Sequence, residues 1–166
     1  MKQIEKQIIV WLKPVPRLPR YITKLIADNL WWVIIIATIV MTISALASLL
    51  AISSYLSYLG NAASYAGIYN TALYSGLWLF FTVLSLIFSS LIAYIYYRSI
   101  TPLRKMHELG WRLLFGVFLI SVLRAAIFSF TTLNVFVIIF TLIFSAIFMA
   151  VGAYLLFEIR HYFVKN

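Results

Sequence analysis

The chain has 166 residues, of which 64% are hydrophobic and only 10% charged, and its formal net charge is +9. Soluble domains carry roughly 45–50% apolar and about 25% charged residues, so this composition excludes an ordinary water-soluble domain. The chain has no cysteine, which excludes disulfides, thiol catalysis and thiolate-bound metal centres within it.

The N-terminal segment 2–13 has the pattern of an amphipathic helix. Its apolar residues recur at helical spacing: Ile4, Ile8, Trp11 and Leu12. Lysines occupy the other positions of the helical wheel. We therefore expect this segment to lie in the membrane interface on the cytoplasmic side, where its lysines attract anionic lipids.

Three prolines, Pro14, Pro16 and Pro19, end this helix and predict a rigid elbow. The sequence from Pro16 to Pro19 also satisfies the PxxP pattern of a peptide ligand, but the elbow interpretation is favoured. The next segment, 21–29, has an apolar side and is expected to run into the first membrane-spanning helix.

Four apolar segments follow, at 30–54, 71–97, 111–130 and 133–157. Each reaches the approximately 20 residues that a helix needs to cross a hydrocarbon core about 30 Å thick. Each is predicted to be a helix, because a spanning segment in lipid must satisfy its own backbone hydrogen bonds. The last two segments are joined by so few residues that they must be antiparallel neighbours.

Charge predicts the orientation of these helices. Every Lys and Arg except Arg124 lies in the N-terminal flank, in the connection 98–112 or in the C-terminal tail. Basic flanks stay in the cytoplasm, so both termini are predicted to be cytoplasmic. Tryptophans that fall at the predicted inner boundary are expected to lie at the membrane interface: Trp31, Trp32 and Trp111.

Small and hydroxylated residues form seams at helical spacing in three of the helices. These residues are Thr38, Thr42, Ala45 and Ser48, then Thr82, Ser85, Ser89 and Ala93, and finally Thr141, Ser145 and Gly152. Such seams let helices approach closely in lipid, and packing is the favoured interpretation. A hydrated path lined by the hydroxyl groups is the alternative.

Arg124 is the sharpest candidate for a functional residue, because a cation within a spanning segment is costly. Ser121 and Thr131 are expected to lie on the same side of the helix and to form a mildly polar stripe with it. One interpretation is an anchor that reaches outer-leaflet phosphates. The other is an inward-facing site for an anion or an acidic partner.

Chemistry by acidic or imidazole groups has few candidates. Outside the extreme N-terminus, the titratable groups that fall at the predicted inner boundary are Asp28, His107, Glu108, Glu158 and His161. Beside so many basic residues, they are interpreted as boundary residues that form weak ion pairs. No catalytic residue, metal site or cofactor is predicted.

The sequence thus predicts an all-α integral membrane protein with four transmembrane helices in an up-down bundle and an N-terminal amphipathic interfacial helix. Its parts are a cytoplasmic segment (1–29), the transmembrane domain (30–157) and a cytoplasmic tail (158–166). A non-enzymatic accessory or interaction protein is expected, with lipid, another membrane protein or a second copy as partner, and no nucleic acid. The alternative is a small transporter or channel subunit for an anionic solute that uses Arg124. The absence of glycosylation and targeting signals favours a bacterial cytoplasmic membrane.

Overall fold

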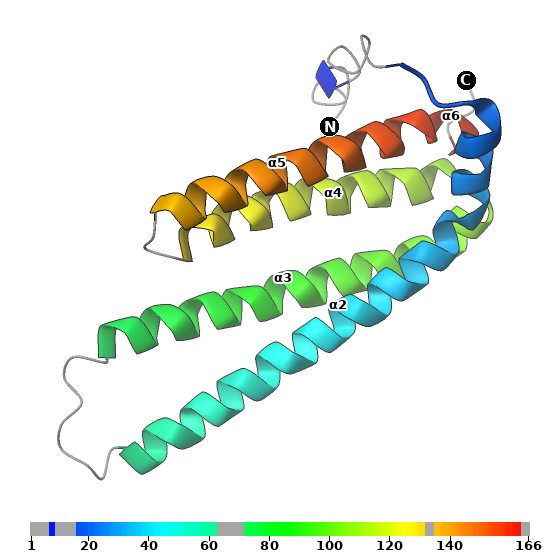
Figure 1. The fold of residues 1–166 in the computed structure, drawn as a ribbon. Helices are drawn as coiled ribbons and strands as arrows, with labels where there is room; N and C mark the ends of the chain where they lie inside the picture. The colour runs from blue at the N-terminus through cyan, green and yellow to red at the C-terminus, as the bar shows by residue number, and fades with distance from the viewer. Residues whose placement is uncertain (1–6, 9–15, 63–71, 132–134, 164–166) are drawn as a thin grey trace. The chain divides into compact units, whose positions relative to one another are not determined.

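The computed structural model describes residues 7–8, 16–62, 72–131 and 135–163, and most of them are helical (Figure 1). The elements are α2 (Arg20–Ala62), α3 (Ala72–Arg104), α4 (Glu108–Phe128), a 3-10 turn η1 (Ser129–Thr131), α5 (Val135–Glu158) and α6 (Arg160–Phe163). The predicted all-α fold is confirmed for the part of the chain that the structure describes.

Four helices are long and apolar enough to cross a membrane: Arg20–Ser57, Gly76–Arg104, Glu108–Phe128 and Val135–Phe163. They correspond to the four predicted segments, but α2 and α3 are longer, with 43 and 33 residues. Apolar runs mark where lipid surrounds a helix, whereas the backbone stays helical into the charged flanks. At 1.5 Å per residue, α2 is roughly 65 Å long and exceeds the hydrocarbon core.

Most of the predicted interfacial helix lies outside the described residues, including Ile4, Trp11 and Leu12. Gln7 and Ile8 are described and are helical. Ile8 is half-buried and packs against the apolar core of unit 1, defined below.

The chain divides into two compact units. Unit 1 comprises Met1–Ile35 and Ile95–Asn166, and unit 2 comprises Ile36–Tyr94. Both α2 and α3 therefore belong to unit 1 at one end and to unit 2 at the other. Each unit is described by itself.

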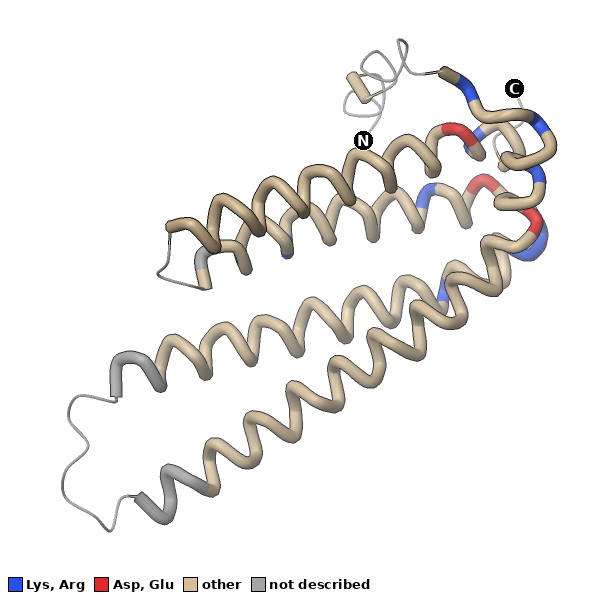
Figure 2. The backbone as a smooth tube through the Cα atoms, viewed as in Figure 1, with Lys and Arg blue, Asp and Glu red and all other residues tan. Residues whose placement is uncertain are grey.

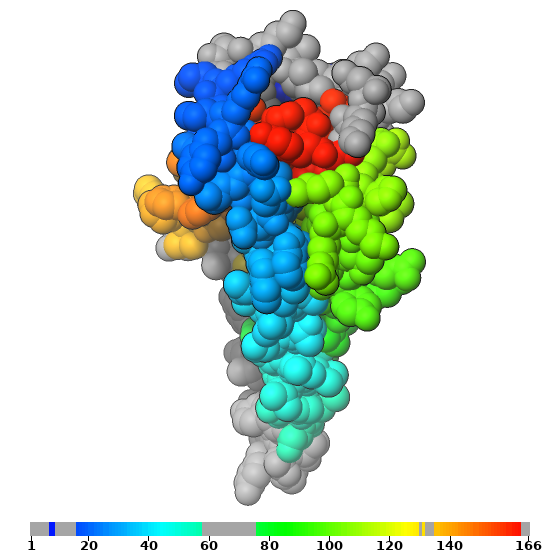
Figure 3. All heavy atoms as spheres, turned by 90° about the vertical axis from the view of Figure 1, so that its right-hand side faces the viewer, coloured from blue at the N-terminus to red at the C-terminus, as the bar shows by residue number. Residues whose placement is uncertain are grey.

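The core of unit 1 joins the first turns of α2, the end of α3, the start of α4 and the end of α5 with α6. Its buried members are Ala27, Ile34, Leu103, Trp111, Leu114, Phe115, Leu156, Ile159 and Phe163. The indole ring of Trp111 stacks on Phe115 at 5.4 Å between centroids and meets Phe157 edge-on at 5.6 Å. Figure 3 shows the start of α2 against α6 in a space-filling view.

The connection between α3 and α4 is a tight turn. The amide of His107 donates to the carbonyl of Pro102 at 2.8 Å, and the amide of Met106 donates to Leu103 at 3.0 Å. Met106 has a φ of 52°, the left-handed conformation that such a helix C-terminus requires and glycine usually supplies. The turn brings α4 back against the end of α3.

Gly110 permits this close return of the chain. A Cβ atom at Gly110 would lie 2.9 Å from the backbone nitrogen of Leu103, too close for a side chain. Further along α4, Phe118 lies 3.8 Å from the position of a Cβ at Gly152 on α5. The prediction that the last two spanning helices are neighbours is confirmed, because α4 and α5 pack side by side (Figure 1).

Unit 2 is a helical hairpin without a charged residue. The hydroxyls of Ser44 on α2 and Ser89 on α3 lie 3.4 Å apart, and the rings of Tyr55 and Trp78 lie 5.2 Å apart. In both pairs the residue numbers add up to the same total, so the antiparallel register of the two helices is constant between the contacts. Ser89 is fully buried, so the seam predicted on α3 lies at this helix contact.

Candidate functional site

The proline elbow is held in place by α5 and α6. The Tyr154 hydroxyl donates to the carbonyl of Pro16 at 2.6 Å, and the amide of Leu18 donates to Glu158 Oε1 at 3.3 Å. The Tyr162 hydroxyl donates to the carbonyl of Arg20 at 3.3 Å. These three side chains recur every four residues, so they form one stripe, which we call the latch: Tyr154, Glu158 and Tyr162. The contacts support the elbow interpretation of the proline segment.

Thr23 extends the latch into the first turn of α2. It is buried, and its hydroxyl lies 3.2 Å from that of Tyr162 and 3.0 Å from the carbonyl of Arg20. The amides of Ile22 and Thr23 both reach the carbonyl of Pro19. The beginning of α2 is therefore bound from its own elbow and from α6.

The basic residues of unit 1 gather where α2 begins, where α3 meets α4 and where α5 ends, with Arg124 as the exception (Figure 2). Two of them lie over tryptophan rings: Arg104 is 5.3 Å from the centroid of Trp31, and Arg160 is 5.3 Å from that of Trp111. Such cation–π contacts place the charges beside apolar rings at one end of the unit.

The three predicted interface tryptophans lie in different surroundings. The Trp32 ring is 55% exposed and stacks on Trp31 at 4.4 Å. Trp111 is only 2% exposed, and its Nε1 donates to the carbonyl of Leu156 at 2.9 Å. Trp111 therefore contributes its ring to the core of unit 1, which its position at a charged boundary did not reveal.

The acidic and imidazole candidates have separate partners. Glu108 forms an ion pair with Arg112 at 2.6 Å on the surface of α4. Glu158 belongs to the latch, and His161 Nδ1 lies 2.8 Å from the carbonyl oxygen of Glu158. Among the residues that the structure describes, no group of three or more His, Cys, Asp or Glu side chains is placed to hold a metal ion.

Arg124 is half-buried on α4, and its guanidinium carbon lies 5.6 Å from the centroid of the Phe128 ring. Ser121, one turn earlier on the same helix, is also half-buried. Thr131 is exposed in η1, and its hydroxyl donates to the carbonyl of Phe128 at 2.8 Å. The Thr131 hydroxyl thus caps the end of α4, and no contact between it and the Arg124 guanidinium is observed in the described residues.

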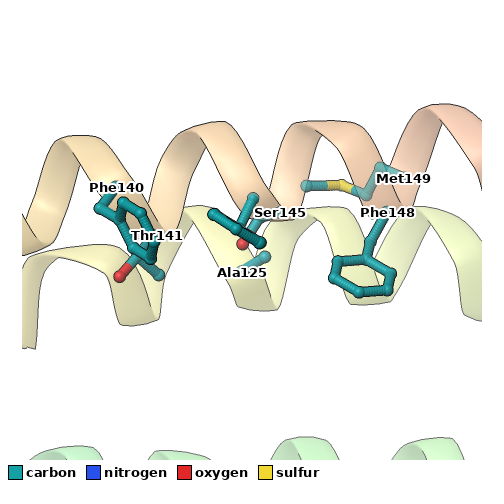
Figure 4. Close-up of a pocket in the computed structure, with 7 residues that line it drawn as sticks. Ala125, Phe140, Thr141, Ser145, Phe148 and Met149 are labelled. Carbon is teal, nitrogen blue, oxygen red and sulfur yellow. The ribbon is translucent and has the colours of Figure 1, made fainter.

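A shallow groove of about 390 Å³ follows α5 beside Ala125 (Figure 4). Its walls alternate aromatic rings with small or flexible side chains, namely Phe140, Thr141, Phe144, Ser145, Phe148 and Met149. The predicted hydroxyl seam of α5 therefore lies in this groove. Phe148 is 73% exposed and Phe140 63%, so the groove is open and mainly apolar.

The latch escaped sequence analysis, because its partners are backbone groups. The carbonyls of Pro16 and Arg20 and the amide of Leu18 have no side-chain signature. The spacing of Tyr154, Glu158 and Tyr162 is a visible signal, but it resembles any helix that ends at a membrane boundary.

No protein family, curated protein or solved structure gave a match to this chain.

Proposed function

We propose that this chain is an integral membrane protein that acts without catalysis, by presenting apolar helix faces to another membrane protein. The observation that carries the proposal is the exposure of α5. Phe136 is 85% exposed and Phe148 73%, and apolar residues between them are exposed on several sides of the helix. Exposed apolar surface of this extent is typical of lipid or protein contact rather than of a water-facing surface.

The division of labour between the ends of the helices supports this proposal. Packing in unit 1 is concentrated around Trp111 and Phe115, at the basic end. The opposite part of α5 has no buried residue before Ala153. The packed end thus serves as the base of unit 1, and the rest of α5 supplies the contact surface.

The proposed setting is a bacterial cytoplasmic membrane with both termini in the cytoplasm. Its support is the distribution of Lys and Arg, which places the elbow and the α3–α4 turn on the cytoplasmic side. The loop between α2 and α3 then lies outside.

Single-cysteine labelling tests this orientation, because the chain has no native cysteine. Ser57→Cys, at an exposed position near the end of α2, should react with an impermeant maleimide in intact cells. Lys105→Cys, exposed in the α3–α4 turn, should react only after permeabilisation. Ser99 belongs to the same basic region but is buried, so it is a poor reporter. The reverse labelling pattern contradicts the proposed orientation.

Photo-crosslinking tests the interaction function. A benzophenone amino acid at Phe148 should give a discrete protein adduct in native membranes, whereas the same probe at Phe115, which is 1% exposed, should react within the chain. A lipid adduct alone at Phe148 contradicts a protein partner on this face. Anion flux through proteoliposomes that depends on Arg124 would instead support the solute-transport alternative.

A further inference from the structure

The elbow and the first two turns of α2 carry cations beside exposed apolar side chains. We call this area the elbow surface, and its members are Arg17, Arg20, Tyr21, Lys24 and Leu25. All five are exposed, with Tyr21 at 77% and Leu25 at 48%. The area lies in unit 1, at the point where the latch holds the chain.

Helix geometry sorts these side chains into adjacent stripes. Residues one turn apart share a side of the helix, so Arg20 lies with Lys24, and Tyr21 with Leu25. The buried residues Thr23 and Ala27 form the stripe that packs into unit 1. The cations therefore border the packed stripe, and the apolar pair lies further around the helix.

The cations of the elbow surface have little local neutralisation. Within residues 16–62, 72–131 and 135–163, no ion pair to Arg17, Arg20 or Lys24 is observed. Asp28 is exposed one turn after Lys24, and Glu158 accepts the amide of Leu18. Three cations thus face one free-standing carboxylate and one carboxylate that is already hydrogen-bonded to the elbow.

We propose that the elbow surface binds the phosphate groups of anionic phospholipids in the inner leaflet. Arg17, Arg20 and Lys24 contact the phosphates, while Tyr21 and Leu25 enter the boundary between headgroups and acyl chains. The apolar pair selects a lipid over a soluble phosphate or a nucleic acid, because neither of these offers an apolar layer beside its charge. This proposal rests on the cytoplasmic placement of the elbow proposed above.

The latch gives the surface its geometry. Tyr154 and Glu158 hold the backbone of Pro16 and Leu18, on both sides of Arg17. Tyr162 holds the carbonyl of Arg20. Because the backbone is fixed at these points, the two guanidinium groups and the ammonium group converge without an ordering cost at the moment of binding.

The test uses the purified full chain in zwitterionic micelles that are titrated with phosphatidylglycerol or phosphatidylcholine, and it follows the melting temperature. Phosphatidylglycerol should raise the melting temperature of the wild type, and phosphatidylcholine should not. The triple variant Arg17→Gln, Arg20→Gln, Lys24→Gln should need at least about ten-fold more phosphatidylglycerol for half of the effect, since each near-surface cation contributes roughly a five-fold factor.

A charge-matched control separates a site from general attraction. The variant Arg98→Gln, Lys105→Gln, Arg112→Gln removes three exposed cations from the connection between α3 and α4. It should respond to phosphatidylglycerol within about two-fold of the wild type, because screened charges outside the site contribute little. An equal loss of response in both triple variants overturns the proposal.

A latch variant tests the role of geometry. Tyr154→Phe with Glu158→Leu keeps every cation and removes one negative charge. Charge alone predicts tighter binding of phosphatidylglycerol, whereas a positioning role predicts binding that is weaker by a factor of about two to five. Tighter binding by this variant overturns the positioning role of the latch.

Two further outcomes decide the source of the phosphate and the leaflet. If pyrophosphate in lipid-free micelles raises the melting temperature as much as phosphatidylglycerol does, the assignment to lipid is wrong. If the elbow variant loses the lipid response while cysteine labelling gives the reverse orientation, the lipid site stands and only the proposed orientation fails.

Discussion

The indole Nε1 of Trp111 donates to the backbone carbonyl of Leu156 at 2.9 Å, and this bond joins the start of α4 to the end of α5. Leu156 belongs to the last turn of α5, where carbonyls lack partners further along their own helix. A side chain from one helix thus satisfies the backbone of its neighbour in the core of unit 1. The bond explains why a tryptophan at a membrane boundary is buried.

Trp111→Phe should lower the free energy of unfolding by about 1–3 kcal/mol, because it leaves a buried carbonyl without its donor while most of the ring stacking on Phe115 is kept. Thermal unfolding in detergent measures this loss. Trp32→Phe is the matched control, since the Trp32 ring is 55% exposed, and it should change stability by less than about 0.5 kcal/mol. Equal effects of the two substitutions would contradict the role of the bond.

Two glycines of α4 should respond in opposite directions to the same substitution. Gly110→Ala places a methyl group 2.9 Å from the Leu103 backbone and should destabilise the chain by about 1–3 kcal/mol through overpacking. Gly116→Ala meets no atom within 4 Å and should stabilise α4 by up to about 1 kcal/mol through helix propensity. Melting temperatures check both signs, and a stable Gly110→Ala variant would show that α3 and α4 do not approach so closely.

The register of the hairpin in unit 2 predicts which engineered cysteines can pair. Ser44→Cys with Ser89→Cys should form a disulfide under mild oxidation, as should Ser48→Cys with Ser85→Cys, which the constant register places opposite each other. Ser48→Cys with Ser89→Cys is offset by one turn and should oxidise much more slowly. Mass spectrometry of the remaining free thiols measures the rates. Fastest oxidation of the offset pair would contradict the register.

Arg124→Leu distinguishes an interior contact from a lipid anchor. The guanidinium lies against Phe128 and is half-buried, so we expect the substitution to lower stability by about 0.5–2 kcal/mol. The melting temperature in detergent, with and without anionic lipid, is the measurement. A variant that is more stable and indifferent to lipid would sink the inward-facing hypothesis and leave an outer-leaflet anchor.

The sequence predicted the parts of the fold that follow from hydrophobicity. Four apolar runs marked four helices, and a connection of few residues placed α4 beside α5. The ends of α2 and α3 were not predictable from apolarity, since helical backbone continues through charged residues such as Arg20 and Arg104. Seams at helical spacing indicated Ser89 but missed its partner Ser44, because the rotation of two paired helices is not contained in either one.

The candidate site was less accessible to sequence reasoning. Arg124 was visible as a cation in an apolar run, but its partner ring Phe128 was one of many aromatic residues. Thr131 was expected to share a stripe with Arg124, yet the helix ends in a 3-10 turn that directs its hydroxyl to the carbonyl of Phe128. The latch depends on backbone groups that every residue has, so composition and spacing could not identify it.

The latch also orders the assembly of the chain in time. The amide of Leu18 and the carboxylate of Glu158 are separated by 140 positions, so the elbow leaves the ribosome long before its partners exist. At ordinary synthesis rates of about 5–20 residues per second, this delay is roughly 7–28 s. During that interval the beginning of α2 has none of its contacts with α5 and α6. Unit 1 closes only when the last helix arrives, so a nascent chain that stalls before Tyr154 carries an elbow that nothing fastens.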